Sequence, residues 1–487
     1  MTSVSSSTVD GLISGLDTST IISQLLSADA APQKQMKTNV STAQLKVTAY
    51  QSVNTKMSAL QTAAENVSKA ATWSSAKATS SSDVATATTS STAQPGTVSL
   101  DVTQLATGRS VLSKGTYSAT DTGAKADMGY PLDVVADGKI VGTVSPSKGT
   151  LSDVVAAINK ATNLGITAVA VRVGEDQYRL QITSTRTGER EGHFQLVPRT
   201  PDGTPDGATA TTLDPHGKVV VPPGAESTNY DDIATAKDAL ATLVTEAGLA
   251  SPANAVLKSS TNTFKDVLNG VDVTAAKTGQ ATITVAGDPD AVASAVEAFV
   301  KAANAAVDTI GIQSRAGAVG SDGKVVGGGT LRGDATLRQL KTSILANMTS
   351  ALGTNVSPAA YGIQSTKDGE LTFDKAKFLE GYKADPVAAQ KLLAPRSVDP
   401  DSTAAGLVDR LAGIAKGATD QYTGSLTTAI TGQNSTISDL TKRIADWDDR
   451  LAGKKERYQK YYSALESSLG KLKSQSSWLA GQLSSLS

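Results

Sequence analysis

Apolar residues near both ends of the chain recur at alternating intervals of three and four. One stripe of this kind runs from Met36 to Val67, and a longer one runs from Ile437 to the end of the chain. This spacing places the apolar side chains on one face of an α-helix and leaves the polar side chains on the other. We therefore predict a long amphipathic helix at each end of the chain.

Each of these stripes needs an apolar partner, because an isolated helix is only marginally stable in water. Burial of one such side chain contributes roughly 1.5–3 kcal/mol. The simplest partner is the other terminal helix, antiparallel because the intervening chain joins the two at one end. The alternative is that each helix packs on its own neighbouring domain. The residues expected to pair are Val40, Val47, Tyr50, Met57 and Leu60 near the N-terminus, and Ile437, Leu440, Ile444, Trp447, Leu451, Tyr462 and Leu465 near the C-terminus.

The two tips of the chain have weaker helix signals than the middle of the stripes. Asp17 can cap a short helix, which the Ala31–Pro32 pair should interrupt because the residue before a proline disfavours the helical conformation. Gly470 and Gly481 lie inside the last helix, where each costs about 1 kcal/mol relative to alanine. We expect both tips to lack order in the monomer and to fold only against other subunits.

Between the stripes the apolar period changes to two, which is typical of β-strands. Residues 131–144 predict a hairpin that turns at Asp137–Gly138, residues 150–161 predict a helix capped by Thr150 or Ser152, and residues 166–184 predict a second strand pair. Strands follow from 259 to 287, helices begin at Pro289 and Asp334, and residues 370–393 close the block. The fold class is thus α+β and multidomain, with a terminal antiparallel helical coiled-coil stalk and β-rich head domains inserted between its two ends.

A prior of roughly 150 residues per domain suggests about three domains, one of them inserted into another. We expect an N-terminal tip over 1–35, a stalk helix over 36–75, an inner head domain over 76–115 and 258–400, an outer head domain over 116–257, C-terminal stalk helices over 401–469 and a C-terminal tip over 470–487.

Composition excludes several classes of function. The chain has 45 Lys plus Arg against 46 Asp plus Glu, so no net field attracts nucleic acid or an anionic membrane. It has no cysteine, and its two histidines, His193 and His216, lie apart in polar surroundings typical of surface loops. The glycine run at 327–329 lacks the spacing of a phosphate-binding loop. We expect no enzyme activity, no metal, no cofactor, no nucleic acid and no membrane-spanning segment.

Several strings along the chain resemble one known family. The box Gly-Leu-x-Ser-Gly-Leu-Asp, residues 11–17, together with the short helix and Ala-Pro pair that follow it, resembles the start of the flagellar filament-capping protein family, also called hook-associated protein 2. Strings at 150–161, 259–274, 333–344, 369–386 and 458–483 resemble the same family in the same order. The resemblance covers nearly the whole chain.

This resemblance implies a structural cap at the distal tip of the bacterial flagellum, outside the cell. The cap promotes folding and incorporation of exported flagellin and prevents its loss. The implied partners are flagellin, other copies of the chain in a ring that is a pentamer on the filament, the hook–filament junction protein, a chaperone of flagellar type III export and, for some members, mucin. The residues expected to dock on the filament or on other subunits are Gly11, Leu12, Gly15, Leu16, Asp17, Ile21, Leu25, Leu472, Leu479 and Leu483.

Three other interpretations remain at this point. The head domains could make the chain a surface adhesin, which is compatible with capping. Flagellin and the hook–filament junction proteins also pair their terminal helices, but they lack the Gly-Leu-Asp box. An enzyme with an unrecognised site would need a convergent set of His, Cys or carboxylate side chains, which the sequence does not indicate.

Overall fold

The computed structural model describes residues 17–199, 212–213, 219–221, 226–244, 256–321, 325–349, 358–366, 369–398 and 405–484. The chain divides into two compact units, of which unit 1 comprises Met1–Trp73 and Pro289–Ser487, and unit 2 comprises Ser74–Asp288. Both ends of the chain therefore belong to the same unit.

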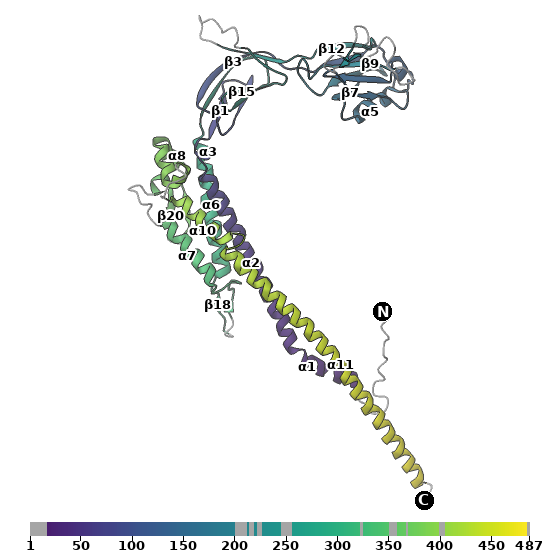
Figure 1. Ribbon diagram of the computed structural model, residues 1–487, viewed down its shortest axis with the longest axis vertical. Coiled ribbons are helices and arrows are strands. Elements are labelled where there is room, and N and C mark those ends of the chain that lie inside the picture. The colour runs from purple at the N-terminus through teal and green to yellow at the C-terminus, as the bar shows by residue number, and fades with distance from the viewer. Residues whose placement is uncertain are drawn as a thin grey trace. The chain divides into compact units, whose positions relative to one another are not determined.

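Unit 1 is mainly helical (Figure 1). Its short strands form two hairpins, β18 (Ala318–Val319) with β19 (Val325–Val326), and β20 (Ile363–Ser365) with β21 (Leu371–Phe373). Its helices are α1 (Thr18–Asp29), α2 (Ala31–Val67), α3 (Ala70–Trp73), α6 (Pro289–Ser314), α7 (Ala335–Thr349), α8 (Lys375–Ala384), α9 (Pro386–Leu393), α10 (Leu407–Thr419) and α11 (Ser425–Ser484), with 3₁₀ turns η1 (Pro358–Tyr361) and η2 (Pro395–Ser397).

The core of unit 1 forms around the second half of α2. Met57 and Leu60 have no exposed surface, and they share one apolar cluster with Phe299 of α6, Leu411 of α10 and Leu426 at the start of α11. Helix α2 is thus packed on three other helices over this half. This cluster anchors both terminal segments of the chain in the same core.

Local signals explain where the helices of unit 1 begin. The carboxylate of Asp17 accepts a hydrogen bond from the Thr20 amide at 2.9 Å and caps α1. The interruption lies at Ala30 rather than at Ala31, which is helical, because Pro32 occupies the first turn of α2, where a missing N–H costs nothing. Asp334 caps α7 through the Leu337 amide at 3.0 Å, as expected.

The inner part of unit 2 contains two antiparallel sheets. A five-stranded sheet has the order β1 (Ala76–Ser80), β17 (Gly279–Gly287), β3 (Gly96–Gln104), β13 (Ala239–Leu243), β14 (Val256–Ser259). A three-stranded sheet has the order β15 (Thr263–Leu268), β16 (Val271–Ala275), β2 (Ala85–Thr89). Leu100, Val273 and Ile283 fill the apolar cluster that the two sheets share.

The outer part of unit 2 has its own core, which includes Leu132, Ile158 and Leu180. Its helix α5 (Leu151–Lys160) begins with a capping box between Thr150 and Asp153. Its strands form sheets of order β12 (Tyr230–Ala234), β4 (Ser110–Ser113), β8 (Gln177–Ser184), β7 (Ile166–Gly174), and of order β6 (Lys139–Val144), β5 (Leu132–Ala136), β9 (Phe194–Pro198). The short helix α4 (Ala124–Asp127) and the strand pair β10 (Thr212–Leu213) and β11 (Val219–Val220) complete this unit.

The predicted hairpin of the outer part is confirmed in detail. Strands β5 and β6 pair antiparallel, and the turn between them places Asp137 at φ 47° and Gly138 at φ 67°. Two consecutive positive φ values are what a type I′ turn requires, and the Asp-Gly pair tolerates them. The capped helix and the second strand pair, β7 with β8, are also present.

The described domain boundaries differ from the expected ones in two places. Strand β4 already pairs with β8 and β12, whereas β13 and β14 extend the inner sheet through β3, so the outer part covers about 110–234. The helices from Pro289 onward belong with the terminal helices in unit 1 and not with a head domain, because α6 supplies Phe299 and its neighbours to the core around α2.

Candidate functional site

The two terminal helices meet in antiparallel orientation. Gln33, near the start of α2, lies opposite residues 444–448 of α11, whereas Leu60, near its end, shares a core with Leu426. Figure 1 shows the two helices side by side over the first half of α2. The predicted pairing of the chain's ends is therefore present.

Two polar contacts that the sequence analysis missed join α11 to the start of α2 and to the end of α1. The Gln33 side chain is 5% exposed, and its Nε2 donates to the carbonyl of Ile444 at 3.3 Å and to the carboxylate of Asp448 at 2.5 Å. A buried polar side chain needs such partners, since an unsatisfied amide costs free energy. Gln33 lies one helical turn before Met36, where the apolar stripe of α2 begins, so the stripe does not single it out.

The second polar contact joins the end of α1 to α11, and we name it the Asp29 clasp. The Asp29 carboxylate pairs with the Lys454 ammonium at 2.6 Å and accepts from the Tyr458 hydroxyl at 3.4 Å. The Asp29 carbonyl accepts a hydrogen bond from the Trp447 indole at 3.2 Å. The clasp lies at the break between α1 and α2, so it ties the last residue of α1 to α11.

The residues predicted to pair along the stalk separate into three groups. Val40 and Val47 are half-buried on the half of α2 that runs along α11, where Ile437, Leu440, Ile444, Trp447 and Leu451 form a half-buried stripe. Tyr50, Met57 and Leu60 instead belong to the core cluster with α6 and α10, in which none of the described residues of 437–465 takes part. Tyr462 and Leu465 are half-buried further along α11. The last three α2 residues therefore lie in this core, and their pairing with the C-terminal stripe stays a prediction.

The residues predicted to dock have different environments. Gly11, Leu12, Gly15 and Leu16 lie outside the described residues. Asp17 is the cap of α1, and the hydrogen bonds from Thr20 lower the pKa of its carboxyl. Ile21 is half-buried and Leu25 is 39% exposed, whereas Ile22, which was not singled out, is buried on the face of α1 that packs against α11.

The C-terminal part of α11 is exposed to solvent. Residues 471–484 are helical and all exposed, including Leu472 at 60%, Leu479 at 54% and Leu483 at 67%. The expectation that this tip lacks order is corrected, because the helix started at Ser425 continues through Gly470 and Gly481 as far as Ser484. Three large apolar side chains with helical spacing on an exposed helix form an apolar stripe that a partner can cover.

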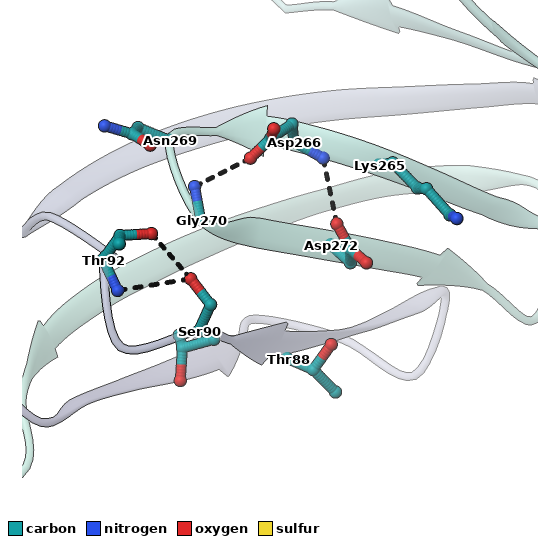
Figure 2. Close-up of a pocket in the computed structure, with 9 residues that line it drawn as sticks. Thr88, Ser90, Thr92, Lys265, Asp266, Asn269, Gly270 and Asp272 are labelled. Atoms are coloured by element: carbon teal, nitrogen blue, oxygen red, sulfur yellow. Dashed lines mark hydrogen bonds between the residues drawn. The ribbon is translucent and has the colours of Figure 1, made fainter.

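A polar depression of unit 2 has the character of a structural turn. It measures about 430 Å³ and lies beside the β15–β16 hairpin (Figure 2). The Asp266 carboxylate accepts a hydrogen bond from the Gly270 amide at 2.8 Å, and the Asp272 carboxylate accepts one from the Asp266 amide at 3.0 Å. The hydroxyls of Ser90 and Thr92 lie 2.8 Å apart. The residues lining it include no histidine, cysteine or aromatic side chain, so they hold the turn rather than a catalytic set.

The other chemical expectations concern histidines, metals and membranes. His193 is exposed, as predicted, and His216 lies outside the described residues. Within the described ranges, no three His, Cys, Asp or Glu side chains are grouped so that they could hold a metal ion. Of the helices described, none is both long and apolar enough to cross a membrane.

Comparison with known proteins places these helices in a family. Residues 14–109 match the family model of the flagellar hook-associated protein 2 N-terminus, and residues 249–474 match that of its C-terminus. The A-type flagellar hook-associated protein 2 of Pseudomonas aeruginosa is 30% identical over 495 residues, which cover 99% of this chain and 98% of that protein. The chain belongs to the flagellar hook-associated protein 2 family.

Two further comparisons agree with this membership. The flagellar hook-associated protein 2 of Escherichia coli strain K12 is 27% identical over 485 residues, or 97% of each chain. The crystal structure of the flagellar cap protein FliD D1-D2-D3 domains from Escherichia coli matches with a TM-score of 0.53 and 24% identity, covering 79% of this chain and 99% of that one. This second likeness shows the fold, an α+β architecture in which the long terminal helices pack together and antiparallel sheets lie between them in sequence.

Membership in the hook-associated protein 2 family settles the broad function. The chain is a flagellar cap protein that acts at the tip of the filament, outside the cell, and it belongs to a structural family rather than to an enzyme family. The sequence-based expectations for family, fold class, function and location are thereby confirmed.

Proposed function

We propose that this cap holds the filament tip through the C-terminal part of α11 and promotes the folding and incorporation of flagellin beneath it. The observation that carries the proposal is the stripe of Leu472, Leu479 and Leu483, which are all exposed on one face of α11. Burying one leucine is worth roughly 1.5–3 kcal/mol, so each of the three would contribute to a contact with an apolar partner.

The placement of this stripe supports a docking role over a structural one. The core of unit 1 is complete without it, because the fully buried residues of α2, α6 and α10 and Leu426 form one cluster far along the chain from residue 471. A segment that contributes nothing to its own core is free to bind a partner. An exposed apolar stripe also risks aggregation, so its presence on the surface favours a role in binding.

The proposal extends to the partners of the cap. We propose that the helical tips contact flagellin, that several copies form a ring, which is a pentamer on the filament, and that the hook–filament junction protein and a type III export chaperone bind the chain before it reaches the tip. The support for these partners is family membership, not a contact within the described residues. Mucin binding, which the resemblance also implied for some relatives, has no observation of its own in the described part of the chain and stays outside this proposal.

The experiment that tests the docking role replaces Leu472, Leu479 and Leu483 with asparagine. Because all three side chains are exposed, the variant should fold as the original does, with each substitution changing stability by no more than about 0.5 kcal/mol. We expect cells with this variant to shed flagellin monomers into the medium and to grow short filaments or none.

A matched control substitutes Ser474 and Ser477 with asparagine, since both are exposed and lie on the opposite face of the same helical turns. Filaments of normal length are expected from the control. Normal filaments from the leucine variant, with flagellin retained, would refute the docking role of the tip.

A further inference from the structure

The apolar stripe of α11 continues on both sides of residue 470. On the C-terminal side Leu472, Leu479 and Leu483 are exposed, and on the N-terminal side Tyr458, Tyr462, Leu465 and Leu469 are half-buried. Consecutive members are three, four or seven residues apart, and an interval of seven is one step of three plus one of four. All seven side chains therefore lie on one helical face. We call this set the α11 stripe.

Helix α1 lies beside the N-terminal half of the α11 stripe. The Asp29 clasp fixes one end of α1 near Lys454 and Tyr458, and α1 follows α11 from there (Figure 1). A helix of 12 residues spans about 18 Å at 1.5 Å per residue, which is roughly half the length of the stripe. The chain itself therefore shows what fits this surface, namely one amphipathic helix.

Few residues of α1 are buried. Only Thr18 and Ile22 of its 12 residues are buried. Helix α2, in contrast, is anchored by Val53, Met57 and Leu60, none of which is exposed. Since Ala30 separates the two helices, α1 can leave α11 without disturbing the core around α2. A short helix with few buried contacts is the kind of element that opens locally before the rest of the structure unfolds.

We propose that α1 is a displaceable cover of the α11 stripe, held by the Asp29 clasp, and that an amphipathic helix of a flagellin subunit takes its place when the cap docks. The displaced α1 leaves the whole α11 stripe, from Tyr458 to Leu483, open to one continuous partner helix. The proposal rests on the docking function proposed above, and it assigns the partner's chemistry: apolar side chains at helical spacing of three and four.

The first test fixes the cover in place. The chain has no cysteine, so Ser23→Cys on α1 with Ser463→Cys on α11 gives a single pair that a short bismaleimide can join. The matched control joins Ser41→Cys on α2 to Ser435→Cys on α11, again two exposed serines on neighbouring helices. We expect the α1-tethered chain to bind polymerised flagellin at least tenfold more weakly than the control-tethered chain.

The results distinguish the cover from the docking function. Equal binding by the two tethered chains would overturn the cover and leave the docking role intact. If even the untethered chain does not bind polymerised flagellin, the docking role fails.

The second test measures opening without any partner. Asp29→Ala removes the ion pair with Lys454 and the bond from Tyr458, so amides of residues 18–29 should exchange about tenfold faster, while those of 53–60 keep their rates. Exchange of α1 only in concert with the core of α2 would overturn the proposal that α1 opens on its own.

Discussion

The clearest consequence for stability concerns two leucines of the terminal stripes, Leu60 and Leu479. Both belong to apolar stripes with the same three-and-four rhythm, yet Leu60 has no exposed surface and Leu479 is 54% exposed. Leu60→Ala removes side-chain atoms from the cluster that joins α2 to α6 and α10, which costs about 2–5 kcal/mol through lost burial and the cavity left behind. Leu479→Ala should change stability by no more than about 0.5 kcal/mol.

Amide hydrogen exchange is the suitable assay, because the chain has two compact units and a single unfolding free energy is poorly defined for it. The slowest amides of α2 and α6 report the free energy of opening unit 1. We expect these amides to exchange at least about thirtyfold faster in Leu60→Ala, since each 1.4 kcal/mol corresponds to a factor of ten. Equal effects of the two substitutions would refute the division of the stripes into a core part and a docking part.

Two smaller predictions test contacts elsewhere in the chain. The hydroxyl of Tyr50 donates to the carboxylate of Asp334, which caps α7. Tyr50→Phe should therefore destabilise unit 1 by about 1–3 kcal/mol, measured by exchange of the α7 amides. An unchanged exchange rate would contradict this role of Tyr50. Gly188 has φ +100°, and a Cβ there would lie 2.6 Å from the Cβ of Ser260, so the backbone and the packing both disfavour a side chain. Gly188→Ala should therefore destabilise unit 2 by more than about 1 kcal/mol, measured by exchange of the β8 amides. An unchanged exchange rate would contradict this.

Much of the secondary structure follows from the sequence because its signals are local. The capping residues Asp17, Thr150 and Asp334 and the turn at Asp137–Gly138 act within a few residues, and each lies where the sequence places it. The antiparallel pairing of the chain's ends also follows, because two long apolar stripes at opposite termini need partners.

The partners of individual residues could not be predicted in the same way. An apolar stripe shows which face of a helix is buried, but not which of several apolar surfaces covers it. Met57 and Leu60 therefore pack on α10 and also on α6, which comes from a part of the chain that the sequence analysis assigned to the head. The Asp29 clasp depends on contacts over more than 400 residues of chain, for instance from Trp447 to Asp29, and no local pattern encodes them.

The most direct test of the central claim asks what the exposed stripe of α11 touches on a living cell. A photo-crosslinking residue replaces Leu479 in the stripe or, as a control, Thr441, which is exposed on the same helix where α11 packs against α2. The account predicts a crosslink to flagellin at the filament tip from position 479 and little or none from position 441. Crosslinks of equal yield from both positions, or none from position 479 in cells with full-length filaments, would contradict it.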